Sequence, residues 1–196
     1  MDVDRFEIRL SGSGGQGIIL ASIILAEAAG IFEGYHVSQT QSYGPEARGG
    51  RCKAEVVISS KQIDYPKAVQ LDMMLSMNQS SCDAYCFDFK PNGLLLVDSG
   101  LVEQVPTSRV VNLPFTKIAR EVAGKNLFAN IVAIGVLGYL CPILSINSLE
   151  AALAARVPKD TKKLNNKALR AGIKAAKKFD MDSLPRSIIP DEEEEI

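Results

Sequence analysis

Histidine is almost absent from this sequence. Its single copy, His36, stands inside a segment predicted as a β-strand, so we expect a structural role for it. One histidine cannot supply a metal motif that needs two, and Ser11, Ser13 and Ser99 lack an evident histidine partner for nucleophilic catalysis. No paired-carboxylate motif stands out. The sequence therefore predicts a chain without catalytic residues of its own.

Cysteine is scarce as well, and the four copies are scattered. Cys52 and Cys141 stand apart, whereas Cys82 and Cys86 form a C-x3-C pair that a helix would place on one face. A zinc or iron–sulfur site normally shows C-x2-C pairs or a run of several cysteines. The pattern favours four reduced thiols over the alternative of a metal site.

Neither sign of charge dominates, and long apolar runs are few. The net charge of -1 offers no basic excess for non-specific nucleic-acid binding. No secretory signal opens the chain. The longest low-charge stretch, residues 127–149, contains Asn130 and Pro142 and is predicted to be buried helix, although its length would also permit a membrane span. We therefore expect a cytoplasmic protein that binds neither nucleic acid nor membrane.

Continuous apolar strands alternate with helical segments along the chain. Such an alternation predicts an α/β, Rossmann-like fold, with a largely parallel sheet and helices on both faces. We expect one folded domain over residues 1–180 and a mobile acidic tail over residues 181–196. The predicted strands are 6–10, 35–39, 51–59, 72–78, 93–100 and 109–113, with a turn at Asn92-Gly93. The predicted helices are 16–29, 80–89, 116–124, 130–141, 145–157 and 162–179.

A glycine cluster, G-S-G-G-Q-G, lies between the first predicted strand and the first predicted helix. It matches the dinucleotide fingerprint G-x-G-x-x-G, but the acidic residue expected at the end of the second strand is missing there, and Glu33 lies at the wrong end. A Walker A loop would require lysine after Gly17, where Ile18 stands. Two interpretations remain: a cradle for a phosphate or another anion, and a strand-to-helix turn that serves packing alone.

A second signal is the segment QSYGPEARGGRCKAEV, residues 41–56. It combines Arg48 and Arg51 with a Gly-Gly pair, and arginine can hold a phosphate or carboxylate bidentately. The alternative is an exposed turn with solvated charges. Because ligands of such sheets bind beyond the carboxyl ends of the strands, we expect this segment, the glycine cluster, Asn78 and Asp98 to converge there.

These residues carry a resemblance. GSGGQGIILASIILAEAA, QTQSYGPEARGGRCKAEVVIS, IDYP, DMMLSMNQ and ANIVAIGVLG resemble, in order and spacing, the gamma subunits of 2-oxoacid:ferredoxin oxidoreductases over about residues 5–175. The tract QTQSYGPEARGG is most similar to the branch acting on 2-oxoglutarate. Branches acting on pyruvate, 2-oxoisovalerate or indolepyruvate remain alternatives, as does a stand-alone nucleotide-binding module.

The resemblance implies a non-catalytic subunit of an enzyme complex that oxidatively decarboxylates a 2-oxoacid. Thiamine diphosphate, magnesium and iron–sulfur clusters would be bound by alpha, beta and ferredoxin-like delta subunits, and ferredoxin would accept the electrons. This subunit would contribute to coenzyme A binding and to assembly, and it would bind no metal. The residues expected to bind coenzyme A, or to contact a partner subunit, are Gly12, Ser13, Gly14, Gly15, Gln16, Gly17, Ser42, Tyr43, Gly44, Arg48, Gly49, Gly50 and Arg51.

Overall fold

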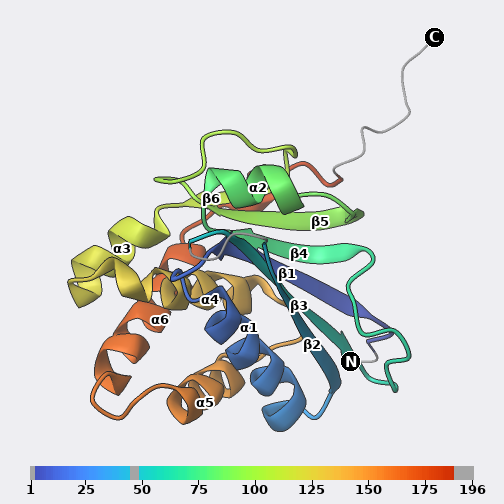
Figure 1. The fold of residues 1–196 in the computed structure, drawn as a ribbon, viewed down its shortest axis with the longest axis horizontal. Coiled ribbons are helices and arrows are strands. Elements are labelled where there is room, and N and C mark those ends of the chain that lie inside the picture. Colours follow the sequence, from blue (N-terminus) through green and yellow to red (C-terminus); the bar gives the residue numbers. More distant parts are fainter. Residues whose placement is uncertain (1–2, 45–48, 188–196) are drawn as a thin grey trace.

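The computed structural model describes residues 3–44 and 49–187 and contains a six-stranded sheet in the order β2-β3-β1-β4-β5-β6 (Figure 1). Only β3 runs against the other strands, because it is antiparallel to both β1 and β2, while β1, β4, β5 and β6 pair in parallel. The prediction of a largely parallel α/β sheet is confirmed. The strands are β1 (Phe6–Ser13), β2 (His36–Tyr43), β3 (Arg51–Ser59), β4 (Leu71–Ser76), β5 (Phe89–Asp98) and β6 (Val110–Leu113).

Three strands, β1, β2 and β5, are longer than the sequence pattern indicated, and one predicted turn is wrong. β1 and β2 continue to Ser13 and Tyr43 because β3 pairs with both strands as far as its first two residues. The Asn92-Gly93 pair lies inside β5, where a shift of register against β4 absorbs the extra residues. A Cβ at Gly93 would lie 2.8 Å from the carbonyl oxygen of Leu71, so glycine allows this close approach.

The helices cover the two faces of the sheet unequally. α1, α3, α4, α5 and α6 share one apolar cluster with the sheet, whereas α2 packs on the opposite face (Figure 1). No helix in the described part of the chain is long and apolar enough to cross a membrane. The helices are α1 (Ile18–Glu27), α2 (Gln79–Tyr85), α3 (Phe115–Ala123), α4 (Ala129–Leu140), α5 (Ile146–Arg156) and α6 (Lys162–Ala176), with shorter turns η1 (Ala28–Phe32), η2 (Asn126–Phe128) and η3 (Met181–Ser183).

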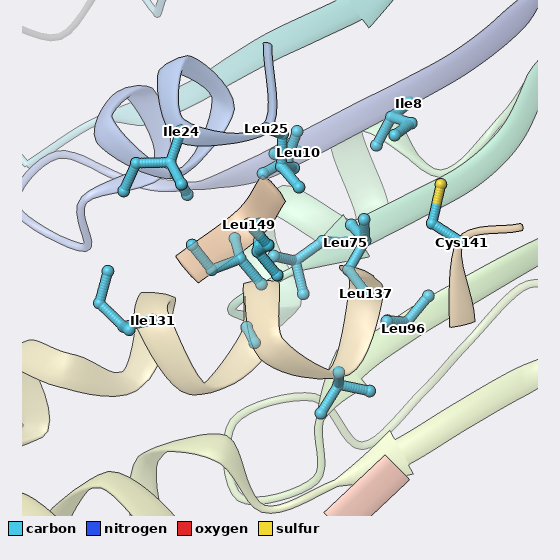
Figure 2. Close-up of a cluster of buried hydrophobic side chains, with 14 of the residues drawn as sticks. Ile8, Leu10, Ile24, Leu25, Leu75, Leu96, Ile131, Leu137, Cys141 and Leu149 are labelled. Carbon is cyan, nitrogen blue, oxygen red and sulfur yellow. The ribbon is translucent and has the colours of Figure 1, made fainter. Parts of the chain in front are cut away.

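The main core lies between the sheet and the five helices. Figure 2 shows side chains from β1, β4 and β5 meeting α1, α4 and α5; they include Leu10, Leu75, Leu96, Ile24, Leu137 and Leu149. α4 carries ten buried residues, which confirms the prediction of a buried helix. It packs on α6 backbone to backbone, because a Cβ at Gly135 or Gly172 would collide with a carbonyl oxygen of the other helix.

Buried charges occupy the opposite face of the sheet. Arg9 of β1 donates from Nε to Glu55 of β3 at 2.9 Å, and its Nη1 donates to the carbonyl oxygens of Tyr85 and Phe87. Burial raises the pKa of Glu55, but its hydrogen bond with Lys53 and the charges of Arg9 and Lys53 outweigh burial, so this pKa lies below its ordinary value. These bonds join β1 and β3 to the segment after α2.

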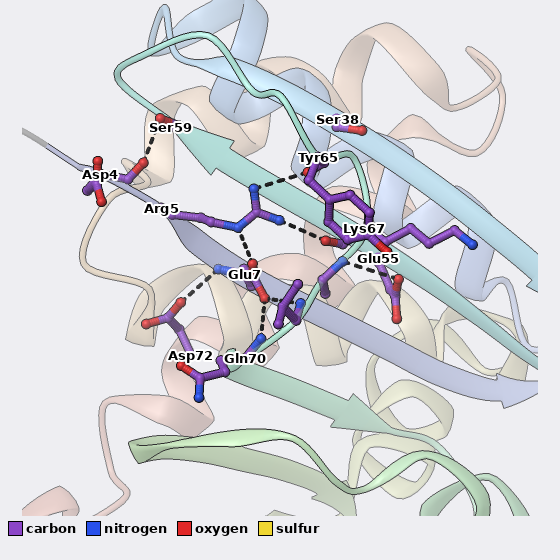
Figure 3. A network of polar contacts seen from close by, with 12 residues as sticks. Asp4, Arg5, Glu7, Ser38, Glu55, Ser59, Tyr65, Lys67, Gln70 and Asp72 are labelled. Carbon is purple, nitrogen blue, oxygen red and sulfur yellow. Dashed lines mark hydrogen bonds and ion pairs between the residues drawn. The ribbon is translucent and has the colours of Figure 1, made fainter.

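A second network on this face holds the connection between β3 and β4, which contains the IDYP tract (Figure 3). Arg5 donates to the carbonyl oxygens of Tyr65 and Lys67 at 3.0 and 2.7 Å. Glu7 accepts hydrogen bonds from the backbone N–H groups of Val69 and Gln70. Arg5, directly before β1, and Glu7 of β1 thus fix this loop over the sheet.

The last described residues continue to contact the fold. Met181 and Leu184 pack against the main core, and Arg109 donates to the carbonyl oxygen of Pro185. Residues 188–196, which include most of the predicted tail, lie outside the described residues. The domain boundary after residue 180 therefore stays a prediction.

Candidate functional site

The residues 12–17, called the glycine loop from here on, lie at the edge of the sheet where five strands end. β2 ends at this edge and the reversed strand β3 begins there, so the Gly49–Arg51 segment is brought next to the loop. The N–H of Gly14 donates to the carbonyl oxygen of Gly50 at 3.0 Å. Ser13 faces Arg51 in the register of β1 and β3. The predicted convergence of the two motifs is confirmed.

The four glycines of the loop serve different purposes. A Cβ at Gly12 would lie 2.8 Å from Ile18 Cγ1, and a Cβ at Gly17, where φ is 73°, would collide with the Asn130 amide. These two glycines therefore serve packing. Gly14 lies against the backbone of Gly49, whereas Gly15 has a φ of 94° and open space where a side chain would be. Only Gly15 leaves room for an incoming ligand to approach the backbone.

Gln16 holds the loop in shape from within. Its Oε1 accepts hydrogen bonds from the Ser13 N–H and from Asn78 Nδ2, both at 2.7 Å, and its Nε2 donates to the carbonyl oxygen of Met77. Asn78 also caps α2, because its Oδ1 accepts from the N–H of Ser81 at 2.9 Å. The glycine loop is thereby fixed to the end of β4 and to the start of α2.

Two grooves flank the glycine loop. The first has a volume of about 510 Å³ and is polar; its lining residues are Ser13, Gly49, Gly50, Arg51, Asn78, Gln79 and Ser80. The second has a volume of about 440 Å³ and is lined by Gly15, Gln16, Met77, Leu101, Thr116, Arg120, Asn126, Leu127 and Ala129. The second groove joins exposed apolar side chains to an arginine, a combination that suits a ligand with both apolar and anionic parts.

The structure does not bring every predicted site residue to these grooves. Ser42 lies in β2 and lines a separate hollow beside Lys53 and Lys67. Tyr43 is largely exposed at the end of β2, and the N–H of Gly44 donates to the carbonyl oxygen of Arg51 at 2.7 Å. Arg48 lies outside the described residues.

Several polar residues at this edge were absent from the predicted binding set. Asn130 donates from Nδ2 to the carbonyl oxygen of Gly17 at 3.1 Å, and its sequence signal is that it begins an otherwise apolar helix. Asn78 was predicted to lie at this edge as the last residue of the predicted strand 72–78, and in the structure it donates a hydrogen bond to Gln16. Asp98, at the end of β5, accepts from the N–H of Thr116 at 2.8 Å and thus holds the start of α3.

This edge of the sheet offers hydrogen-bond donors from the backbone and from side chains. α1 begins at Ile18 directly after the glycine loop, so its first N–H groups and its positive dipole end face the loop. Backbone N–H groups, the start of a helix and arginine side chains are donors that hold phosphates. Among residues 3–44 and 49–187, no group of three or more His, Cys, Asp or Glu side chains could hold a metal ion.

Among known proteins, several similar chains are subunits of 2-oxoglutarate synthases. The chain is 46% identical to the 2-oxoglutarate synthase subunit KorC of Methanocaldococcus jannaschii, over 89% of this chain and 96% of that protein. The KorC subunit of Archaeoglobus fulgidus is 37% identical, over 87% and 88% of the two chains.

Solved structures agree. A keto/oxoacid ferredoxin oxidoreductase gamma subunit from Geobacter sulfurreducens matches with a TM-score of 0.79 and 42% identity, over 89% of this chain and 99% of that chain. The 2-oxoglutarate:ferredoxin oxidoreductase of Magnetococcus marinus, solved with 2-oxoglutarate, coenzyme A and succinyl-CoA bound, shares the fold with a TM-score of 0.79 at 24% identity, over 91% of this chain and 32% of that chain.

The family model for pyruvate ferredoxin/flavodoxin oxidoreductase matches residues 7–175. This range agrees with the extent of the resemblance that the motifs indicated, about residues 5–175. The match spans the whole sheet and all six helices except the last residue of α6 and one residue at the start of β1. The chain therefore belongs to the pyruvate ferredoxin/flavodoxin oxidoreductase family.

Proposed function

We propose that this chain is the gamma subunit of a 2-oxoglutarate:ferredoxin oxidoreductase, a complex that decarboxylates 2-oxoglutarate to succinyl-CoA and reduces ferredoxin. The observation that carries this proposal is the 46% identity with a KorC subunit over nearly its full length. A ketoisovalerate oxidoreductase subunit VorA from Methanothermobacter thermautotrophicus is 35% identical, but the match spans only 27% of that protein. The 2-oxoglutarate branch is therefore favoured over the 2-oxoisovalerate branch.

The proposed role of the chain is to bind coenzyme A and to hold the subunits of the complex together. Its glycine loop offers hydrogen-bond donors for an anion, and its sequence shows no evident pair of nucleophile and base. Thiamine diphosphate, magnesium and iron–sulfur clusters would be held by alpha, beta and delta partner subunits. We expect such a complex to be cytoplasmic, where its proposed acceptor ferredoxin would be found.

Coenzyme A is the ligand that we infer for the glycine loop and its two grooves. The residues fit its chemistry: Gly15 leaves its backbone open, the start of α1 attracts anions, and Arg120 and Arg51 stand at the two grooves. Leu101 and Leu127 offer exposed apolar surface for the uncharged parts of the molecule. When bound, coenzyme A supplies the thiol that accepts the acyl group. The contribution of this chain would be to hold its phosphates in place.

The function is tested by affinity purification of the tagged chain from its native cells without oxygen. The eluate is assayed for coenzyme A-dependent reduction of a viologen dye with 2-oxoglutarate, pyruvate and 2-oxoisovalerate. We expect larger subunits to co-elute and 2-oxoglutarate to be the active substrate. Activity with another oxoacid would change the branch. An inactive eluate that holds this chain alone would favour a stand-alone nucleotide-binding module.

The ligand is tested by Gly15→Ala in the assembled complex. A methyl group at Gly15 enters the open space above the loop, so we expect the KM for coenzyme A to rise about tenfold, since loss of one or two phosphate hydrogen bonds costs about 1.4 kcal/mol. Gly34→Ala is the matched control, because Gly34 has a φ of 80°, equally open surroundings and a position away from the loop. An equal KM in both variants would assign the loop to packing or to a partner subunit.

A further inference from the structure

Two thiols meet at the end of α2, on the face of the sheet opposite the main core. Cys82 is the fourth residue of α2, and Cys86 follows its last residue. Their Sγ atoms lie 3.2 Å apart and form a hydrogen bond. Cys86 has a φ of -83° and a ψ of 71°, so its backbone has already left the helical conformation. The relative position of the two thiols is therefore not fixed by regular helix geometry, as it would be for two cysteines inside a helix.

The two cysteine residues differ in their exposure to solvent. Cys82 is 1% exposed and belongs to a small apolar cluster with Leu71, Met74 and Leu95. Cys86 is half-buried at the rim of the same cluster. The pair thus combines one partly exposed cysteine with one fully buried cysteine.

The hydrogen bond between the thiols shifts their pKa values in opposite directions. The hydrogen bond from Cys86 lowers the pKa of Cys82, and the same bond raises the pKa of Cys86. Arg9 lowers the pKa of Cys86 from one side, while Asp83 raises the pKa of both thiols. In the resting pair the charge therefore lies on Cys82 and the proton on Cys86, so attack by Cys86 follows transfer of its proton along the bond to Cys82.

We propose that Cys82 and Cys86 form a redox-active dithiol that a small-molecule disulfide oxidises to an intramolecular disulfide. The Cys86 thiolate attacks the external disulfide, whose S–S bond breaks and releases one thiol, leaving a mixed disulfide on Cys86. The Cys82 thiolate then attacks Cys86 Sγ and releases the second thiol. One S–S bond forms in the protein, two S–H bonds are lost there, and two electrons and two protons pass to the external reagent.

The other cysteines form a contrasting set within the same chain. Cys52 and Cys141 are each 3% exposed. Burial raises the pKa of the Cys52 thiol and raises the pKa of Cys141 to about 12. These two thiols should stay reduced under conditions that oxidise the pair. The proposal does not depend on the substrate of the proposed complex.

The test is a redox titration of the full chain without oxygen. Folded protein is equilibrated with oxidised and reduced glutathione at graded ratios, quenched with acid, alkylated and digested with trypsin. Both cysteines lie in the tryptic segment 68–109, whereas Cys52 and Cys141 fall in segments 52–53 and 126–156. We expect segment 68–109 to lose two hydrogens and both alkyl groups. Its equilibrium constant for oxidation should exceed that of the urea-unfolded chain by about tenfold or more, which corresponds to about 30 mV.

Two variants complete the test, since either alone could disturb α2. In Cys86→Ser, the remaining Cys82 should resist glutathione because it is buried. In Cys82→Ser, Cys86 should accumulate the mixed disulfide. Equal or weaker oxidation of the folded chain relative to the unfolded chain would overturn the proposal. So would preferential oxidation of Cys52 or Cys141.

Discussion

At the scale of single residues, the glycine loop contains glycines of two kinds, those packed tightly against other side chains and one that faces open space. Gly12 and Gly17 are required by the side chains packed against them, and Gly15 is exposed beside open space. A sequence pattern cannot separate these cases, because the side chain that packs against Gly17 belongs to Asn130, which is 113 residues away in the sequence. The interpretation as a packing turn therefore applies to Gly12 and Gly17, whereas the anion cradle stays a proposal, for Gly15.

Substitution at Gly17 should cost more stability than substitution at Gly15. Gly17→Ala combines a left-handed backbone with a collision against Asn130, so we expect a loss of roughly 2–4 kcal/mol in the free energy of unfolding. Gly15→Ala carries the backbone strain alone and should lose roughly 1–2 kcal/mol. Urea denaturation of both variants measures the difference. Equal losses would show that Asn130 moves aside without cost.

At the scale of elements, the contact between α4 and α6 depends on the absence of side chains. A Cβ at Gly172 would collide with the carbonyl oxygen of Val132, and a rigid backbone atom cannot move aside as a side chain can. We expect Gly172→Ala to destabilise the chain by roughly 1–3 kcal/mol, which thermal unfolding would measure. Lys174→Ala, on the exposed side of the same helix, is the control and should change stability by less than about 0.5 kcal/mol. An equal loss of stability at both positions would show that alanine substitution weakens α6 in general and not its contact with α4.

Glu33 joins the π-helical turn η1 to the start of α5. Hydrogen bonds from the side chains of Ser148 and Ser145, together with the Ser145 N–H, lower its pKa against a small opposing effect of burial. Because the folded state lowers this pKa, the stability from the Glu33 carboxylate is complete above its unfolded pKa of about 4.3 and is lost as pH falls through the folded value.

Glu33→Gln should therefore destabilise the chain at pH 7 by roughly 0.3–1 kcal/mol, the value of a negative charge near the start of a helix. The difference from the natural chain should shrink when the pH is brought below about 4. Urea denaturation at pH 7 and at pH 3.5 makes the comparison. A difference that stays constant across this range would indicate that the carboxylate charge has no part in holding α5.

Much of the element pattern could be predicted from local sequence. Gly124 ends α3 with a φ of 73°, and Ser145 caps α5, as their positions indicated. The extension of β2 to Tyr43 could not be predicted, because its polar residues are typical of a loop and only the pairing with β3 keeps them extended. The same long-range pairing reversed β3 and brought Gly50 to Gly14. Local signals located the glycine loop, whereas the contacts of Gln16 with Met77 and Asn78, and of Gly17 with Asn130, join residues distant in sequence.

At the scale of the whole molecule, the end of the folded unit is open to test. Met181 and Leu184 contact the main core beyond the predicted boundary at residue 180. A chain truncated after residue 180 should lose roughly 1–3 kcal/mol of stability, the value of partly burying two apolar side chains. A chain truncated after residue 187 keeps both contacts and is the reference for this loss. Identical stability of the two truncated chains would keep the boundary at residue 180.

The position of β2 at the end of the strand order has a consequence for the isolated chain. No other strand of the described residues pairs with its outer side, and β2 is eight residues long, without proline or lysine and with unbroken register against β3. Proteins commonly guard such an edge with charges, bulges or proline, because an open edge invites strands of other molecules to join the sheet. Outside a complex, this edge is therefore where aggregation of the chain should begin.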